Sequence, residues 1–328
     1  MFTHPEVQYH SVEPVAGREG LVGLSTADFR RLNRLDPDPC GWIPYCIDES
    51  EVRLVCATGL DARTVAERGL HYAQLRSMTT QIATIPTALV PSVATLPLER
   101  IYVFSPGRCG STLLCQLLRS AGIPAFAEPG FYLPCLQRAR GASASNRTLL
   151  TDRLAKLEYL LLQPFDHSAT AVIKPNPYCS GDLELFLGTS PATPRVRSIA
   201  LLRRIQPWSC SWGAFNQTLV EQDIAIYIQY LKQLEKLIQR TDCLVVNYED
   251  IIASPKNVVS LIGRHLTVDV DLSGIDASMG IDSHAGDRAW KGSASADDPI
   301  REILVNALWQ LRRPDELIER LDIRSQTG

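Results

Sequence analysis

The feature that most constrains the fold of this chain is an alternation of short apolar runs with helical patterns, which begins near residue 100. Four runs are short and almost continuously apolar, and they are RIYVF (100–104), TAVIK (170–174), RSIALL (197–202) and CLVVNY (243–248). Such runs suit strands that are buried on both faces. Helical patterns lie between them, for example at 152–163 and 225–240. Strands that alternate with helices predict a parallel sheet with crossover connections. We therefore expect an α/β fold of the P-loop type, with three layers and a central, mostly parallel sheet flanked by helices.

The first 95 residues follow a different pattern. Their patterns predict, in order, a helix start, a strand, a helix and a connector with three prolines, at 25–35, 52–58, 61–83 and 84–100. We interpret 1–95 as an N-terminal α+β extension of unknown role and 96–328 as the P-loop domain.

The bulk composition excludes several classes of protein. A net charge of −3 gives no overall attraction to nucleic acid or to an anionic membrane, so an anion site must be built locally. No apolar run approaches the ~20 residues that span a bilayer, and the N-terminus lacks the pattern of a secretory signal. Nine scattered cysteines without a CxxC pair indicate free thiols, and neither a disulfide framework nor a metal site. We expect a cytoplasmic protein without a nucleic-acid partner.

The stretch FSPGRCGSTLLC (104–115) places a glycine turn between a predicted strand and a predicted helix. In this context backbone N–H groups and a helix N-terminus can hold a phosphate. The Walker pattern GxxxxGK[ST] is not met, because two residues separate Gly107 from Gly110 and Arg108 stands before Gly110. A magnesium-dependent NTPase normally needs the missing lysine. The loop therefore suits a phosphate whose hydrolysis is not the reaction, and the alternative is a plain strand–helix turn.

The string RCGSTLLCQLL resembles the 5′-phosphosulfate loop of sulfotransferases, which use 3′-phosphoadenosine 5′-phosphosulfate (PAPS). The resemblance implies that the donor's 5′ end contacts Arg108, Cys109, Gly110, Ser111 and Thr112. Two departures stand out: Gly107 separates Pro106 from the basic residue, and Cys109 replaces a serine.

A second segment, RSIALLRRIQPWSCSW, is similar to the part of these enzymes that grips the 3′-phosphate. The resemblance implies that Arg203 and Ser211, eight positions later, bind this phosphate. A guanidinium forks onto phosphate oxygens, which suits the role. The proline lies four residues after Arg203, where the family often has it after two, so Arg204 or Ser209 remains an alternative partner.

Two further segments resemble the family. In CLVVNYEDIIASPKNVVSLIGRHL (243–266), the residues 248–250 are interpreted as structural, closing the strand and capping a helix. In DRAWKGSAS (287–295), Lys291 and Gly292 are candidates for closing over the nucleotide, with Trp290 near the adenine. A solvated surface loop is the alternative for this last segment.

A hydroxyl acceptor needs a base, and Glu128 in AFAEPGFYL is our candidate. Sulfotransferases of the bacterial trehalose type have a similar Glu-Pro there, and an apolar rim would raise the pKa of such a carboxyl. Capping a helix or pairing with an arginine is the structural alternative. Lys174 is a second catalytic candidate that could touch the transferring sulfonate, its alternative being a strand end that faces solvent. Asn176 takes the position of the catalytic histidine of cytosolic sulfotransferases. His167 and His284 are weak candidates.

The leading hypothesis is therefore a PAPS-dependent sulfotransferase that transfers without a metal. An ATP-dependent P-loop small-molecule kinase and a catalytically silent nucleotide-binding protein are the alternatives. The acceptor is an unidentified small molecule, carbohydrate or natural product, and the sequence gives no oligomeric state.

Overall fold

The structure is a computed structural model. The residues that it describes are 8–14, 29–34, 42–47, 51–57, 64–65, 72–90, 99–139, 141–162, 170–177, 179, 185–186, 197–204, 207–208, 211 and 220–279. The chain divides into two compact units, and each is described by itself. The first unit comprises Met1–Arg100 and Pro124–Thr193, and the second comprises Ile101–Ile123 and Pro194–Gly328.

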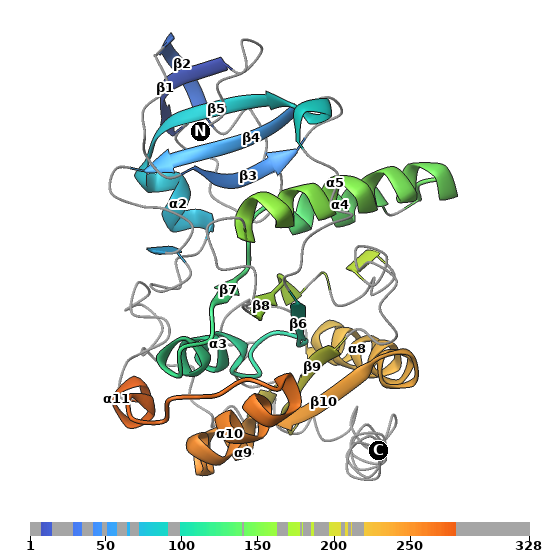
Figure 1. Ribbon diagram of the computed structural model, residues 1–328. Helices are drawn as coiled ribbons and strands as arrows, with labels where there is room; N and C mark the ends of the chain where they lie inside the picture. The colour runs from blue at the N-terminus through green and yellow to red at the C-terminus, as the bar shows by residue number, and fades with distance from the viewer. Residues whose placement is uncertain are drawn as a thin grey trace. The chain divides into compact units, whose positions relative to one another are not determined.

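The strands form two sheets of five (Figure 1). The first has the order β2-β1-β5-β4-β3 and is antiparallel throughout. Its strands are β1 (Gln8–Pro14), β2 (Phe29–Arg34), β3 (Ile43–Ile47), β4 (Glu51–Ala57) and β5 (Thr79–Pro86).

The second sheet has the order β10-β9-β6-β8-β7, and its pairs β9–β10, β6–β9 and β7–β8 are parallel. Its strands are β6 (Arg100–Phe104), β7 (Ala125–Ala127), β8 (Ala171–Lys174), β9 (Arg197–Leu202) and β10 (Asp242–Asn247). Every residue of β6 and β8 is buried, as expected for strands covered on both faces. The predicted α/β class with a central parallel sheet is confirmed.

The N-terminal predictions were partly wrong. Residues 29–34 form strand β2, which pairs with β1, where the sequence predicted a helix start at 25–35. Within 61–83, α2 covers only Tyr72–Met78, and β5 follows at once and runs to Pro86, into the predicted connector. The 3-10 helix η2 (Thr87–Leu89) comes next. Pairing with neighbouring strands outweighed the local helical spacing, as it often does for short segments.

The first unit also contains helices α4 (Tyr132–Ala139) and α5 (Ala144–Leu162). Helix α5 packs against α4 and against β3 of the antiparallel sheet (Figure 1). A fully buried carboxylate fixes this packing. Glu158 of α5 accepts hydrogen bonds from Arg100 Nη1 at 2.6 Å and from Tyr132 Oη at 2.7 Å. Because both oxygens of the carboxylate have donors, the charge can be buried.

In the second unit, helix α3 (Ser111–Ser120) follows the glycine turn as predicted. Of its five buried residues, Ser111, Leu114, Cys115 and Leu118 share one face, and Leu117 is buried beside it. Gly122, at φ +85°, ends the helix, and Ile123 N donates to Leu118 O at 2.9 Å.

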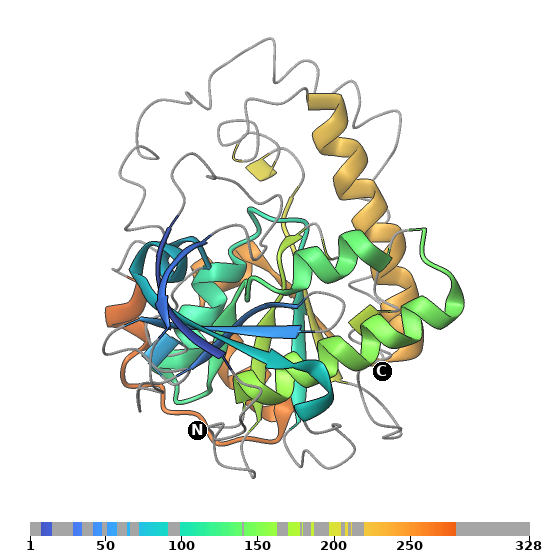
Figure 2. The same ribbon diagram turned by 90° about the horizontal axis from the view of Figure 1, so that it is seen from above.

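The other helices of the second unit complete its layer. They are α8 (Val220–Arg240), α9 (Tyr248–Ala253), α10 (Pro255–Leu266) and α11 (Ile275–Met279). Helix α8 is one continuous element, drawn in gold in Figure 2, and it packs with α10 against β10. The hydroxyl of Tyr230 on α8 lies 3.0 Å from Phe104 O and 3.1 Å from Leu201 O. The carboxyl ends of β6 and β9 are thereby tied to the same side chain.

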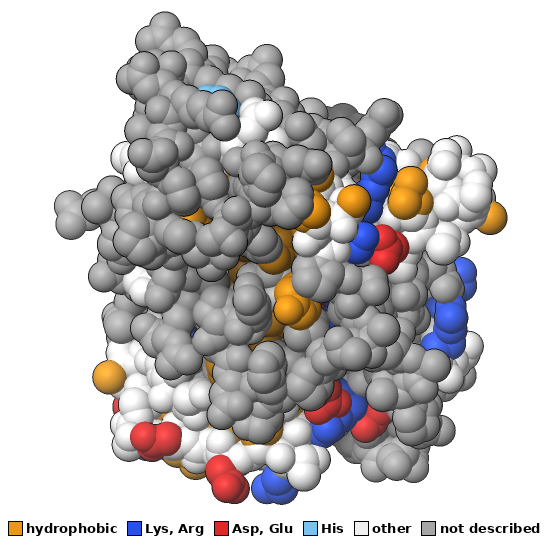
Figure 3. All heavy atoms as spheres, turned by 45° about the horizontal axis from the view of Figure 1, so that its top comes forward, with side chains coloured by type: hydrophobic (Ala, Val, Ile, Leu, Met, Phe, Trp, Pro, Cys, Tyr) orange, Lys and Arg blue, Asp and Glu red, His pale blue; other side chains and the backbone are white. Residues whose placement is uncertain are grey.

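The described surface carries both signs of charge. Acidic and basic side chains are interspersed on the face drawn in Figure 3. Among the described helices, none combines the length and the apolarity that a bilayer crossing requires.

We predict that Arg100→Leu destabilises the protein by about 3–5 kcal/mol, because it leaves the Glu158 carboxylate buried without its guanidinium. Urea unfolding measures the loss. Asp152→Asn is the matched control, since Asp152 is 46% exposed and makes an i,i+4 pair with Lys156; it should cost about 0.5 kcal/mol or less. Equal losses for the two variants would contradict the role of the buried pair.

Candidate nucleotide and acceptor sites

The loop that joins β6 to α3 has an unusual backbone. Gly107, Arg108 and Gly110 all have positive φ, at +84°, +52° and +76°. A positive φ is rare for a residue other than glycine, and Arg108 is such a residue. Turns that mix left-handed and right-handed residues gather backbone N–H groups into concavities that bind anions.

Two carbonyls of this loop are held by the segment that follows β9. Trp208 Nε1 donates to Gly107 O at 2.8 Å, and Arg203 Nη1 donates to Arg108 O at 2.7 Å. A trans peptide directs its C=O and its N–H to opposite sides. The N–H groups of Arg108 and Cys109 therefore point away from Trp208 and Arg203.

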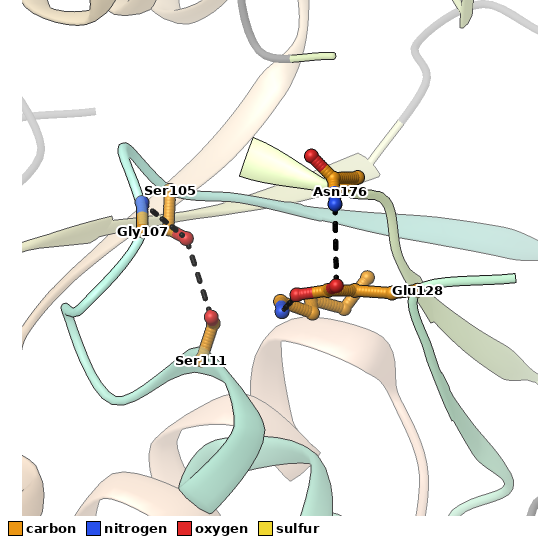
Figure 4. A network of polar contacts seen from close by, with 6 residues as sticks. Ser105, Gly107, Ser111, Glu128 and Asn176 are labelled. Atoms are coloured by element: carbon orange, nitrogen blue, oxygen red, sulfur yellow. Dashed lines mark hydrogen bonds and ion pairs between the residues drawn. The ribbon is translucent and has the colours of Figure 1, made fainter. Parts of the chain in front are cut away.

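The start of α3 supplies further donors. Leu114 N donates to Gly110 O at 2.8 Å, so the first helical bond begins at the loop. The preceding amides, those of residues 111–113, have no acceptor within the helix and carry the positive end of its dipole. Ser105 Oγ lies 3.2 Å from Ser111 Oγ and accepts from Gly107 N at 3.3 Å (Figure 4). These contacts fix the loop from inside.

Cys109 contributes backbone rather than a reactive thiol. Its side chain is fully buried, and burial raises the pKa of the thiol well above its usual range, although Arg203 and Arg108 act in the opposite direction. The thiol therefore stays neutral. The exchange of serine for Cys109 leaves the N–H of this position in place.

Arg203 lies against the loop from the carboxyl end of β9. Its guanidinium carbon is 4.2 Å from the centroid of the Tyr248 ring, which is cation–π contact distance. Its Nε is buried and has no hydrogen-bond partner among the described residues. A buried donor of this kind is costly unless an acceptor binds to it. Arg204, the alternative arginine, is exposed, and its amide donates to Glu249 Oε1 at 3.2 Å.

Ser211 approaches the loop as well. Arg108 Nε lies 3.5 Å from Ser211 Oγ, a long contact that joins the two segments expected to hold opposite ends of the nucleotide. Of the predicted residues, Arg108 to Thr112, Arg203 and Ser211 thus belong to one neighbourhood of the second unit. Lys291 and Gly292 lie outside the described residues, as do Trp290, Ser209, His167 and His284.

Glu128 and Lys174 meet in the first unit, at the carboxyl ends of β7 and β8. Glu128 Oε1 pairs with Lys174 Nζ, and Glu128 N donates to Lys174 O at 2.7 Å. Asn176 Nδ2 donates to Glu128 Oε2 at 3.3 Å (Figure 4). Lys174 is 2% exposed, so the solvent-facing strand end that was its alternative interpretation is wrong. The structural alternative for Glu128 was pairing with an arginine, and the partner in the structure is Lys174.

The sequence did not indicate the contacts that three residues of the two sites make. Trp208 donates to the loop, Asn176 donates to Glu128, and the Tyr248 ring packs against the Arg203 guanidinium. Trp208 and Tyr248 stood within quoted segments and Asn176 was named at the histidine position, but no pattern indicated which atoms they would reach. Among the described residues, no three His, Cys, Asp or Glu side chains are gathered so that they could hold a metal ion.

Comparison with known proteins gives matches at the level of structure alone. No protein-family model matches the chain, and no curated protein matches it in sequence. The solved structures named here are all sulfotransferases, the family that the sequence motifs resemble. A mouse sulfotransferase complexed with PAP is 11% identical, with 70% of this chain and 89% of that chain covered and a TM-score of 0.41.

Two bacterial structures match similarly. The sulfotransferase domain of the Synechococcus PCC 7002 olefin synthase is 17% identical, with coverage of 65% and 94% and a TM-score of 0.39. The Alicyclobacillus acidocaldarius sulfotransferase is 14% identical, with coverage of 53% and 85% and a TM-score of 0.38. At these values the likeness is distant, and we draw the function from the residues of the sites.

We predict that Gly110→Ala is more destabilising than Gly122→Ala. Both positions have positive φ, which costs an alanine about 1–2 kcal/mol. A Cβ on Gly110 would lie 2.5 Å from Tyr248 Cδ2, whereas nothing lies within 4 Å of one on Gly122. The overlap should add about 1–3 kcal/mol in urea unfolding. Equal costs at the two glycines would show that Tyr248 does not press on the loop.

Proposed function

We propose that the chain is a sulfotransferase that moves the sulfuryl group of PAPS to a hydroxyl or amine of a small molecule, carbohydrate or natural product. The observation that carries the proposal is the Arg203 arrangement. One of its nitrogens holds the loop carbonyl of Arg108, and its buried Nε has no partner among the described residues. A phosphate oxygen would satisfy that donor, and charge-assisted bonds of this kind are strong.

The two phosphates of PAPS would lie on different sides of the loop. The amides of Arg108 and Cys109 point away from Arg203, and with the first amides of α3 they suit the 5′-phosphosulfate. Arg203 and Ser211 suit the 3′-phosphate. The Arg108 side chain, 3.5 Å from Ser211, suits the charge that develops on the leaving phosphate. Gly110, which has no side chain, would let the loop backbone approach the phosphate closely. Lys291 and Gly292 are proposed to close over the nucleotide.

The transfer itself needs an attacking oxygen or nitrogen, a base and a stabilised leaving group. The acceptor atom would bond to sulfur while the bond from sulfur to the 5′-phosphate oxygen breaks. The products are the sulfated acceptor and adenosine 3′,5′-bisphosphate. Glu128 would take the acceptor's proton and later release it to water. Lys174, paired with Oε1, would hold the Glu128 carboxylate in place between turnovers.

Nucleotide binding gives the first test. Adenosine 3′,5′-bisphosphate should raise the melting temperature in EDTA, and Arg203→Lys should weaken its affinity by about 10- to 100-fold. Lysine loses the fork and the stacking on Tyr248, and hydrogen bonds to charged groups contribute ~1.5–3 kcal/mol. Arg204→Lys is the matched control, because the Arg204 side chain is exposed. Stabilisation by ATP with magnesium alone would favour a kinase and contradict the proposal.

Turnover gives the second test. With ³⁵S-labelled PAPS and a panel of acceptors, Glu128→Gln should lower the rate by about 10²- to 10⁴-fold, the usual contribution of a base. It should leave the nucleotide-induced melting shift unchanged, because Glu128 is proposed to act on the acceptor and not on the nucleotide. Arg108→Ala should abolish turnover with the fold intact. Nucleotide binding without label transfer to any acceptor would favour a silent binding protein.

A further inference from the structure

The Lys-Pro-Asn segment at the end of β8 points one face at a single carboxylate. Residues two apart in an extended chain share a face, and a residue before proline is held extended. Lys174 precedes Pro175, so Lys174 and Asn176 fall on the same side. Both reach Glu128, Lys174 through Nζ to Oε1 and Asn176 through Nδ2 to Oε2 at 3.3 Å.

This cluster is buried as well as polar. Lys174 and Asn176 are 2% and 5% exposed, and the Glu128 side chain is 13% exposed. The backbone of Glu128 has φ +52°, a conformation that costs a non-glycine residue free energy. It is held there by the bond from Glu128 N to Lys174 O at 2.7 Å. Each oxygen of the carboxylate therefore has a fixed donor, and the carboxylate has a fixed orientation.

The two donors are not equivalent when a proton arrives. An ammonium has three donors and no acceptor, so it cannot receive a hydrogen bond from a protonated oxygen. A side-chain amide has an NH₂ group that donates and a carbonyl oxygen that accepts. It can donate to a carboxylate or, after its amide group rotates by 180°, accept a hydrogen bond from a carboxylic acid. The Oε2 that faces Asn176 is thus the oxygen suited to carry the proton.

We propose that Asn176 is a positioning residue for the base: it orients Glu128 and presents Oε2 as the atom that accepts the acceptor's proton. This inference rests on the proposed function, in which Glu128 is the base. It gives Asn176 a task that its sequence position did not suggest, because asparagine does not titrate and cannot replace a histidine base. Lys174 is a charged group that faces Glu128 within the first unit, and the substitutions of Asn176 leave it in the chain.

Asn176→Leu, which keeps the size and removes the amide, is the first test. Loss of a donor to the carboxylate disfavours its charged form, so the acid limb of the kcat/KM profile should move to higher pH by about one unit. The maximal rate should fall about tenfold or more, with the KM for PAPS unchanged. Asn146→Leu, at an exposed asparagine of α5, is the matched control and should change neither. An unmoved acid limb would overturn the proposal.

A second variant guards against misfolding of the first. Asn176→Asp keeps the shape and places a like charge beside Oε2, so the acid limb should move further in the same direction. Asn176→Gln, which keeps an amide, should restore part of the wild-type rate. If Asn176→Gln is as slow as Asn176→Leu while the acid limb stays fixed, the role of Asn176 is packing alone and the proposal fails.

A readout that needs no turnover separates this inference from the proposed function. The titration of Glu128 can be followed by NMR of ¹³C-labelled glutamate, assigned with Glu128→Gln. Its midpoint should be higher in Asn176→Leu than in the wild-type protein. A higher midpoint without sulfuryl transfer to any acceptor would contradict the proposed function. It would still support the inferred effect of Asn176 on Glu128. An unchanged midpoint would overturn the inference whatever the activity.

Discussion

The candidate nucleotide site depends on two hydrogen bonds that hold the outward carbonyls of one loop. Trp208 and Arg203, both after β9, bind the carbonyls of Gly107 and Arg108. Peptide planarity then turns the next amides to the other side. A sheet with parallel strands brings the carboxyl ends of β6 and β9 to one edge, which is where such folds bind ligands. The loop geometry proposed to bind an anion is therefore a product of the sheet and not of the loop sequence alone.

The two groups of candidate residues belong to different compact units. Arg108 to Thr112, Arg203 and Ser211 lie in the second unit, and Glu128, Lys174 and Asn176 lie in the first. The first group is rich in N–H donors, and Nε of Arg203 has no acceptor among the residues that the structure describes, which suits a donor nucleotide. The second group is built around one carboxylate, which suits proton transfer. Substitutions in either group can be assigned to binding or to chemistry by separate measurements.

Much of the P-loop region could be predicted from the sequence because its signals are local and strong. RIYVF and STLLCQLLRSAG are long enough apolar patterns to specify a strand and a helix, and Gly122 ends that helix as predicted. The structure of the first 95 residues was harder to predict. Residues 29–34 become a strand by pairing with β1, and the local pattern of these residues does not report that partner. The contacts of Trp208, Tyr248 and Asn176 are likewise long-range, and for that reason they appear only in three dimensions.

A crystal structure of the protein with adenosine 3′,5′-bisphosphate, grown in EDTA, tests the central claim most directly. The account predicts the 5′-phosphate within hydrogen-bond distance of the amides of Arg108, Cys109, Ser111 and Thr112. It predicts the 3′-phosphate against Nε of Arg203. Density for the nucleotide at any other place, or a loop in which Arg203 no longer holds the carbonyl of Arg108, would contradict it.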